Sequence, residues 1–416
     1  MTPQTKKRIE QIRRGEVPEG YKKTKIGIVP EEWETRSLSD ISAEITESVG
    51  TKELETLSIS AGIGFVNQAK KFGKELSGKQ YKKYTVLHKN DFSYNKGNSK
   101  KYPQGCIYRL IDREEAAVPD VFECFRINNQ NNIYFEQLFA SGFLNKELSK
   151  RINHGVRDNG LLNLTGRDFY KSAVMVPPLT EQKKIAEILQ TQDKLIALQQ
   201  KKIEELKKLK KAYLSKMFPK KGCNVPEIRF PGFTDPWEQR KLGDVVQITM
   251  GQSPDGSTYS DEPSDYILVQ GNADLQNGWV CPRIWTTQIT KKADAGDLIM
   301  SVRAPAGAMG KTAYNAVIGR GVAAIKGNEF IYQLLVKMDM DGFWKTLSCG
   351  STFESLNSDN IKNAEVKVPT TAEQVQIGDF FRHLDNLITL HQRKLEEMKI
   401  YKKSLMQLLL TGIVRM

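Results

Sequence analysis

The chain has 416 residues, of which 39% are hydrophobic and 9% aromatic, so it is long enough for two or three domains with real cores. Its formal net charge of +13 indicates a polyanionic partner, although a basic protein without such a partner could have the same balance. No apolar run approaches the ~18 residues that span a membrane, the N-terminus has no signal-peptide core, and the cysteines lack CxxC spacing. We therefore expect a cytoplasmic protein with reduced thiols and no metal site.

The chain begins with residues 1–20, which are predicted to form a short basic helix ending at Gly15 or Pro18. A segment containing tryptophan follows at residues 26–41, and it recurs at residues 233–245. The recurrence aligns Trp33 with Trp237 and Arg36 with Arg240. Because the spacing is kept, each copy is expected to open a duplicated unit.

The first globular domain is predicted at residues 21–173, with mixed α and β structure. Runs of β-branched and aromatic residues predict strands within 54–60, 83–95, 105–111 and 121–127, and a helix is expected from residue 133 to about 150. From Lys70 to Lys101 the chain has ten lysines and two acidic residues, with aromatic residues between them. Lysines can contact phosphates and amides can bond base edges, although a solvated lysine-rich loop is an alternative. The candidate DNA contacts are Lys70, Lys71, Asn95, Lys96, Asn98, Lys100, Lys101 and Tyr102.

The most informative stretch is residues 174–211, which recurs at residues 366–403 with a constant offset of 192. Each copy is β-rich, reaches a proline, and continues as a helix of roughly 35–40 residues, on the order of 55 Å long. Thr180 is the expected N-cap of the first helix. Apolar residues at spacings of three and four predict an apolar stripe on each charged helix. The two helices either pack on separate domains or, as we favour, cover each other as a coiled coil. Gln192 and Gln199 interrupt the first stripe, His391 aligns with Gln199 in the repeat, and polar residues at such positions can fix the register.

A linker rich in proline at residues 220–231 separates the first helical region (174–219) from a second globular domain at residues 232–365. The second helical region is residues 366–416. The second domain follows the same plan as the first, but its interior sequence hardly matches. Its candidate DNA contacts are Arg303, Lys311 and Arg320, because arginine can bond guanine with two hydrogen bonds or clamp a phosphate. For each of the two arginines, a structural role in a salt bridge or at a strand end is an alternative of at least equal weight.

No catalytic motif is complete in this sequence. Residues 305–312 approach a P-loop, but Pro305 stands where the first glycine is required. The four histidines have no metal-ligand spacing, and neither GxSxG nor HExxH is present. A binding module is therefore a better interpretation than an enzyme.

The motif VPPLTEQKKIAEIL (residues 176–189), its second copy from residue 368, and PGFTDPWEQRKLGDV (residues 231–245) resemble the specificity subunit of type I restriction-modification systems. Residues 93–105 and 296–325 also resemble segments of that family's target-recognition domains. The second copy departs from the motif at residues 370–372, where Thr-Thr-Ala replaces Pro-Leu-Thr.

This resemblance implies an α+β fold with two target-recognition domains and two helices paired as an antiparallel coiled coil, related by a pseudo-twofold repeat. Each domain would read one half of a bipartite double-stranded DNA target, and the coiled coil would set the spacer. The chain would have no cofactor of its own. It would assemble with two modification subunits, which methylate adenine with S-adenosyl-methionine, and two restriction subunits, which use ATP and Mg.

The residues assigned to the spacer helices and to assembly with these partners are Glu181, Gln182, Ile185, Leu189, Leu195, Glu373, Gln374, Ile377, Phe381 and Leu387. Two alternatives remain. One is a standalone DNA-binding scaffold with two recognition domains that recruits no methyltransferase, and the other is a nuclease with its own active site.

Overall fold

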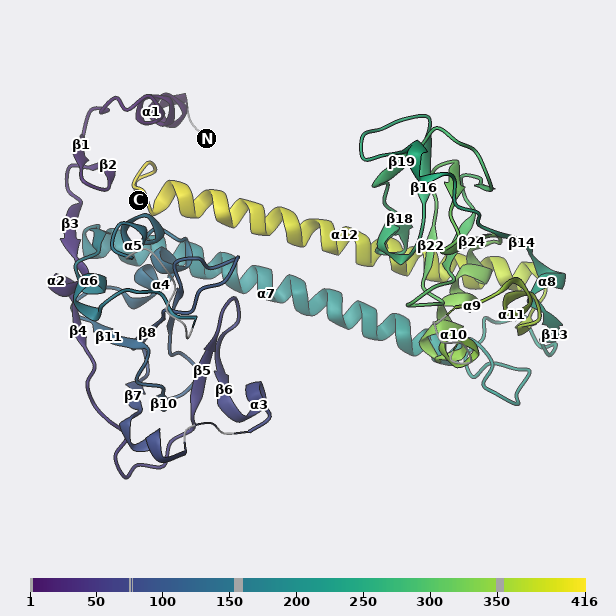
Figure 1. Ribbon diagram of the computed structural model, residues 1–416, viewed down its shortest axis with the longest axis horizontal. Helices are drawn as coiled ribbons and strands as arrows, with labels where there is room; N and C mark the ends of the chain where they lie inside the picture. Colours follow the sequence, from purple (N-terminus) through teal and green to yellow (C-terminus); the bar gives the residue numbers. More distant parts are fainter. Residues whose placement is uncertain (1–2, 75, 77, 153–159, 349–354) are drawn as a thin grey trace. The chain divides into compact units, whose positions relative to one another are not determined.

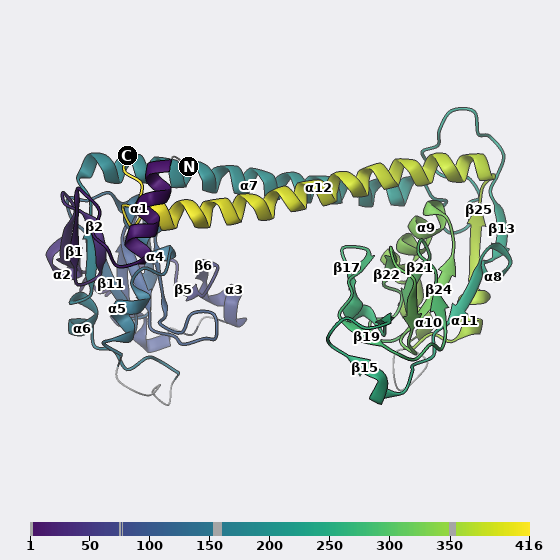
Figure 2. The ribbon, with the colours of Figure 1, turned by 90° about the horizontal axis from the view of Figure 1, so that it is seen from above.

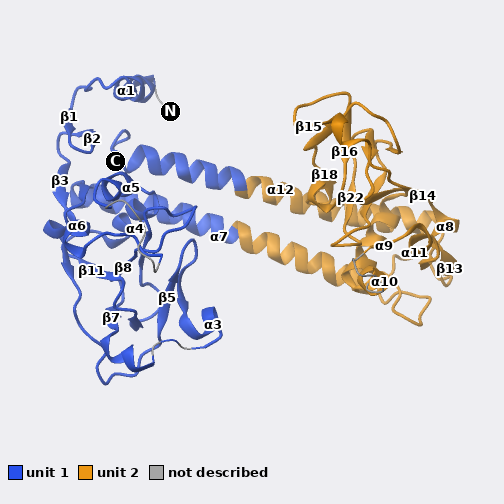
Figure 3. Ribbon diagram, viewed as in Figure 1, with its two compact units in different colours: residues 1–198, 396–416 blue, residues 199–395 orange. Residues whose placement is uncertain are grey.

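The computed structural model describes residues 3–74, 76, 78–152, 160–348 and 355–416, and it divides into two compact units (Figure 3). Unit 1 comprises residues 1–198 and 396–416, and unit 2 comprises residues 199–395. Each unit therefore contains one globular domain and a portion of each long helix. None of the helices within these described ranges is both long and apolar enough to cross a membrane.

Unit 1 is built on a four-stranded antiparallel sheet in the order β4-β11-β8-β9. Two two-stranded sheets, β5-β6 and β10-β7, extend the domain on one side (Figure 1). The elements are α1 (Pro3–Arg13), β1 (Tyr21–Thr24), β2 (Gly27–Pro30), β3 (Glu34–Ser37), α2 (Leu38–Ile41), β4 (Ser42–Glu44), β5 (Leu57–Ser60), β6 (Gly64–Asn67), α3 (Gln68–Phe72), β7 (Thr85–His88), β8 (Phe92–Asn95), β9 (Cys106–Arg109), β10 (Glu115–Val118), β11 (Glu123–Ile127), α4 (Asn132–Ala140), α5 (Asn145–Ser149), α6 (Gly166–Tyr170) and β12 (Ala173–Val176).

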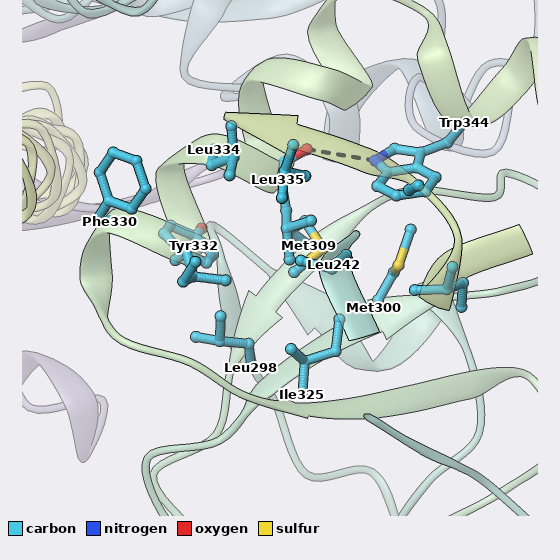
Figure 4. Close-up of a cluster of buried hydrophobic side chains, with 14 of the residues drawn as sticks. Leu242, Leu298, Met300, Met309, Ile325, Phe330, Tyr332, Leu334, Leu335 and Trp344 are labelled. Atoms are coloured by element: carbon cyan, nitrogen blue, oxygen red, sulfur yellow. Dashed lines mark hydrogen bonds between the residues drawn. The ribbon is translucent and has the colours of Figure 1, made fainter. Parts of the chain in front are cut away.

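Unit 2 has a different interior, with two mixed sheets in the orders β14-β24-β21-β22-β18-β17 and β15-β19-β16-β23-β20. Its largest apolar cluster lies between the first sheet and α9, where Trp344 donates a hydrogen bond to the Leu335 carbonyl (Figure 4). The elements are β13 (Glu238–Lys241), α8 (Leu242–Val245), β14 (Gln247–Met250), β15 (Tyr259–Ser260), β16 (Tyr266–Val269), β17 (Leu275–Gln276), β18 (Trp279–Val280), β19 (Ile284–Thr286), β20 (Lys292–Ala293), β21 (Leu298–Ser301), β22 (Met309–Lys311), β23 (Ala316–Ile318), β24 (Val322–Lys326), α9 (Glu329–Met340), α10 (Phe343–Ser348), α11 (Ser358–Lys362) and β25 (Glu365–Val368).

The repeated segments take equivalent places in the two units. In unit 1, β3 from the tryptophan segment pairs antiparallel with β12, the strand that precedes the long helix. In unit 2, β13 pairs with β25 in the matching register, so that Arg36↔Val174 corresponds to Arg240↔Val366. Trp33 and Trp237 are both buried beneath these pairs. The duplicated scaffold that the sequence predicts is therefore present in both units.

The two long helices are α7 (Leu179–Lys216) and α12 (Thr371–Leu409), with 38 and 39 residues (Figures 1 and 2). They pack together and run antiparallel. In unit 1 Lys402 of α12 binds Asp193 of α7, and in unit 2 Lys210 binds Asp385, further along α7 and nearer the start of α12. Gln199 contacts His391, its partner in the repeat alignment, with 2.9 Å between Nε2 and Nδ1. The predicted helix lengths and pairing are thus confirmed.

Each domain core includes residues from both long helices. The core of unit 1 takes Ile185 and Leu189 from the start of α7, together with Leu409 and Leu410 from the end of α12. The core of unit 2 takes the corresponding residues of the other repeat: Ile377 and Phe381 from α12, and Met217 and Phe218 just after α7. The end of each helix therefore completes the core of the domain that the other helix follows.

Two local predictions were wrong. The helix begins at Leu179, so Thr180 lies in its first turn, and the Pro178 carbonyl accepts hydrogen bonds from the Glu181 and Gln182 amides. The helix expected at residues 133–150 is two helices, α4 and α5. Gly142 between them has a φ of +76°, a left-handed conformation that an uninterrupted α-helix does not contain.

Candidate nucleic-acid interface

The lysines of the lysine-rich stretch of domain 1 lie on α3, on a 3-10 helix (Gly78–Lys83) and in loops around β7 and β8. Lys70 follows the N-cap of α3, where the Asn67 side chain accepts a hydrogen bond from the Lys70 amide. The side chains of Lys70, Asn98, Lys100 and Lys101 are exposed, and none of these lysines forms an ion pair with a described carboxylate. These cations are available to an external anion.

Other candidates from this stretch have partners inside the domain. Lys96 forms an ion pair of 2.5 Å with Glu123, and the two side chains are only 16% and 14% exposed. Asn95 accepts a hydrogen bond from the Gly97 amide, which shapes the turn after β8. Lys71 donates to the Ile59 carbonyl and lies over the Phe72 ring. These contacts favour a structural role for Lys96 above all.

The loop of residues 99–105 returns to the tip of the β5-β6 hairpin. A Cβ at Gly62 would lie 3.2 Å from the Tyr102 hydroxyl, and the Gly62 amide donates to the Tyr108 hydroxyl at 2.8 Å. Burial raises the pKa of Tyr108 to about 12, so its phenol remains neutral. Lys101 lies 5.8 Å from the centre of the Tyr102 ring. A lysine and a tyrosine are thus held side by side on a short, braced loop.

In domain 2, four segments that are distant in the sequence converge; we call residues 251–253, 269–271, 302–303 and 318–322 the loop cluster. Backbone hydrogen bonds join them. The Gly251 amide donates to the Val322 carbonyl at 3.0 Å, the Gly319 amide to Val269 at 2.8 Å, and the Val302 amide to Gly321 at 2.9 Å. The Ser253 hydroxyl accepts from the Arg320 amide at 3.1 Å. The cluster is therefore a rigid end of the domain rather than a set of independent loops.

Glycines allow this close approach. A Cβ at Gly251 would lie 2.1 Å from the Gly319 carbonyl oxygen, and a Cβ at Gly321 would lie 2.0 Å from that of Gln270. Neither distance is physically possible, so any side chain at these positions would push the segments apart. At the surface of the cluster Gln252, Arg303 and Arg320 are exposed, and Gln270 is half-buried.

The structure brings two of the three arginine and lysine candidates of domain 2 together. Arg303 and Arg320 are both exposed. Arg303 follows Val302 and Arg320 precedes Gly321 in the sequence, and the Val302 amide donates a hydrogen bond to the Gly321 carbonyl. Lys311 lies elsewhere. It pairs with Glu329 at 3.0 Å and is 13% exposed, with its ammonium 4.5 Å from the centre of the Tyr332 ring. Lys311 is thus already neutralised within the domain.

Sequence reasoning missed a cavity of about 310 Å³ in unit 2, which lies between the β17-β18 hairpin and the two helices. Lys207, Lys210, Trp279 and Asn386 are among the residues that line it. The Asn277-Gly278 turn before Trp279, with φ angles of +50° and +78°, is a hairpin signal that was present in the sequence. Nothing in the sequence indicated that this hairpin packs next to the helices.

The polar motif residues at the start of the helices are buried within their own units, except Gln374, which is half-buried. Glu181 accepts hydrogen bonds from Trp33 and Arg415, and Glu373 accepts two from Arg229. Gln182 and Gln374 each donate to the carbonyl of the proline five residues earlier. Ile185, Leu189, Ile377 and Phe381 are core residues, whereas Leu195 and Leu387 are 43% and 39% exposed. Of these candidates, only the last two have substantial surface to offer a partner.

Among the residues that the structure describes, no group of three or more His, Cys, Asp or Glu could hold a metal ion. Two different α/β domains, each joined to a copy of one strand–helix unit and each with exposed cationic groups on ordered loops, define a class of protein. That class is a nucleic-acid recognition protein with two separate recognition domains on a duplicated helical scaffold.

Comparison with known proteins gives the family. The sequence model for the type I restriction modification DNA specificity domain matches residues 30–208 and 234–399. The chain therefore belongs to this family and is a DNA specificity subunit of a type I restriction-modification system, which is the non-catalytic subunit.

Named relatives are similar to this chain in sequence, and solved structures share its fold. A protein of Methanocaldococcus jannaschii that bears the name "Putative type I restriction enzyme MjaX specificity subunit" is 29% identical over 95% of this chain and 97% of its own length. The MjaVIII specificity subunit of the same organism is 25% identical over 62% of this chain and 66% of its own. A structure from work on assembly and conformational transition of the type I system has a TM-score of 0.58, with 21% identity and coverage of 93% and 99%. The S subunit from M. genitalium also has a TM-score of 0.58, with 15% identity and coverage of 91% and 96%, so the fold is shared.

Proposed function

We propose that each globular domain reads one half of a bipartite DNA sequence, and that the α7–α12 pair sets the spacer between the halves. The observation that carries this proposal is the contrast between duplicated and divergent parts. The strand–helix units keep the same register in both copies, whereas the sheets of the two domains differ in strand order. A constant scaffold with two different interiors suits two different recognition events at a fixed separation.

The loop cluster of domain 2 and the lysine-bearing loops of domain 1 are the proposed contact surfaces. Arg303 and Arg320 combine exposed guanidinium groups with a rigid backbone, which favours base-edge bonding over loose phosphate contact. Lys70, Lys100 and Lys101 are the proposed phosphate contacts of domain 1. Lys71, Asn95, Lys96 and Lys311 have internal partners, so we assign them a smaller part in DNA binding.

We also propose that two copies of one modification subunit bind the helix pair. Leu195 and Leu198 of α7 are 43% and 63% exposed in unit 1, and their repeat equivalents Leu387 and Leu390 of α12 are 39% and 63% exposed in unit 2. Each pair is spaced three residues apart on its helix, and neighbouring exposed apolar side chains form the kind of patch that marks a protein interaction site. Because both repeats retain them, the covering partner is expected once for each repeat. Two restriction subunits complete the proposed assembly, and S-adenosyl-methionine, ATP and Mg are bound by these partners.

The test is methylation mapping of DNA from cells that contain the modification subunit, with and without this chain. We expect N6-methyladenine at a split motif with a fixed spacer, only when the chain is present. New methylation at a continuous motif would contradict the proposal that two domains each recognise one half of the target. A stable complex without any new methylation would favour a DNA-binding scaffold instead.

A further inference from the structure

The same three-residue polar network occurs in both units, and the proposed function does not use it. Each copy joins a glutamine from a domain helix, an aspartate from one long helix and a lysine from the other. We call these sets the Gln–Asp–Lys triads. They are Gln137–Asp193–Lys402 in unit 1 and Gln333–Asp385–Lys210 in unit 2.

In unit 1, α4 of the domain meets both long helices through this network. The Gln137 amide donates to Asp193 Oδ2 at 2.8 Å, and the Lys402 ammonium donates to Asp193 Oδ1 at 2.5 Å. Gln137 is 6% exposed and the Lys402 side chain 17%, whereas the Asp193 side chain is 43% exposed. One carboxylate therefore links three helices.

In unit 2 the geometry repeats. Gln333 on α9 donates to Asp385 Oδ2 at 2.8 Å, and Lys210 donates to Asp385 Oδ1 and Oδ2 at 2.7 and 2.9 Å. Gln333 is fully buried, and the Lys210 side chain is 16% exposed. Gln333 also donates to Glu329 at 2.9 Å, a contact that joins this triad to the Lys311 pair.

The repeat connects the two triads crosswise. Asp193 and Asp385 are 192 residues apart, as are Lys210 and Lys402, so each triad takes its aspartate from one repeat and its lysine from the other. The domain interiors have diverged, yet the glutamine is present in both. Because the network is present in both domains although their interiors differ, it indicates a requirement that is common to the two domains.

Stability alone explains this network poorly. Exposed ion pairs contribute little, and buried polar groups are often no more stabilising than apolar ones. Moreover, the Oε1 atoms of Gln137 and Gln333 are both buried without a hydrogen-bond partner among the described residues, which is unfavourable. Polar contacts between helices do, however, fix their register, because any shift would separate the paired groups and leave the buried glutamine amide without its acceptor.

We propose that Gln137, Asp193, Lys402 and their counterparts in unit 2 are positioning residues for target specificity. Each triad fixes its domain helix to one register of the helix pair and thereby restricts the spacer lengths that the protein accepts. This inference rests on the proposed two-domain reading of DNA. The triad residues themselves contact no DNA.

The experiment maps methylation by the complex of full-length chain and modification subunit, on a plasmid library that contains both half-sites at every spacer from three bases shorter to three bases longer than the native one. The variants are Asp193→Asn and Asp385→Asn, which keep the shape of the side chain but remove its charge. We expect unchanged half-sites, with the preference for the native spacer over its neighbours reduced at least about fivefold. The control is Glu396→Gln, which removes an exposed i,i+3 pair with Lys399 on α12 and should leave the preference intact.

A charge exchange separates positioning from folding. In the double variant Asp193→Lys with Lys402→Asp, the Gln137 amide can rotate so that its Oε1 accepts from the new lysine. We expect the spacer preference to return in the double variant and to be reduced in either single variant. The proposal is overturned if the Asn variants keep the native preference, or if they lose methylation together with thermal stability and the exchange restores neither. Absence of any split-motif methylation by the wild-type complex would instead refute the proposed function.

Discussion

At the scale of single residues, the lysines of domain 1 divide into two kinds that the sequence does not distinguish. Lys100 is exposed, whereas Lys96 is paired with Glu123. Both stand in the same stretch of glycine, asparagine and lysine, and only the return of β11 beside β8 brings Glu123 to Lys96. A local pattern can predict a basic surface, but it cannot identify which cation has an internal partner.

We predict opposite effects for these two lysines. Lys100→Ala should remove about one phosphate contact and reduce the slope of log K against log salt by roughly 0.9, with little change in thermal stability. Lys96→Met should leave the slope unchanged and destabilise the fold by about 1–3 kcal/mol, because Glu123 loses its partner. Salt titration of DNA binding and thermal melting measure the two effects. A reduced slope for Lys96→Met would return that lysine to the DNA interface.

The glycines of the loop cluster give a second prediction. Gly321→Ala should force residues 270 and 321 apart and cost about 1–3 kcal/mol through overpacking. We expect weaker discrimination at the half-site read by domain 2, with the other half-site unaffected. Gly256→Ala is the matched control, because a Cβ at Gly256 meets nothing within 4 Å. Binding to duplexes with one half-site scrambled measures the effect, and equal losses at both half-sites would contradict it.

The buried thiols give a prediction about pH. Burial raises the pKa of Cys106 to about 11 and that of Cys124 to about 12, above the ordinary value of 9.0. Since both folded-state pKa values are raised, their contribution to stability is complete below pH 9 and is lost as the pH rises toward 11 and 12. At pH 8 iodoacetamide should modify the exposed Cys223 and spare both buried thiols until the protein is denatured. Mass spectrometry of the digested protein measures this, and labelling of Cys124 in the folded protein would contradict it.

At the scale of elements, the long helices were the most predictable part of the chain. Their apolar stripes continue over about ten turns. Because the two segments align without a gap, evidence for one helix is also evidence for the other. The break of the 133–150 helix at Gly142 was less visible, because apolar residues continue on either side of it. The loop cluster could not be predicted at all, since hydrogen bonds between distant backbone segments leave no periodic signal.

The ends of the helices carry a prediction of their own. Leu409→Ala should destabilise unit 1 by about 2–5 kcal/mol, because Leu409 is 2% exposed in its core. Hydrogen exchange should therefore accelerate in β8 and β11. Ile400→Ala on the same helix is the control, because Ile400 is 67% exposed. Accelerated exchange confined to the strands of unit 2 would contradict the prediction.

At the scale of the whole molecule, the helix pair is the proposed ruler. Insertion of four residues after Leu198 and four after Leu390 lengthens each helix by about 6 Å, or roughly two base pairs at 3.4 Å each. We expect both half-sites to remain and the methylated spacer to lengthen by one or two base pairs. Methylation mapping measures this result, and an insertion in one helix alone should abolish methylation. Altered half-sites with an unchanged spacer would contradict the proposal that the helix pair sets the spacer length.

The crossing of the helix ends has a consequence for synthesis on the ribosome. Trp33 and Leu409 share the core of unit 1, but at about 5–20 residues per second they emerge on the order of 20–75 s apart. Unit 2, whose residues 199–395 are continuous, completes its core first. The order of folding is therefore expected to be the reverse of the order of translation. Nascent chains stalled on a C-terminal linker, so that the chain up to about residue 400 has left the ribosome, should resist protease in unit 2 while unit 1 is still cleaved.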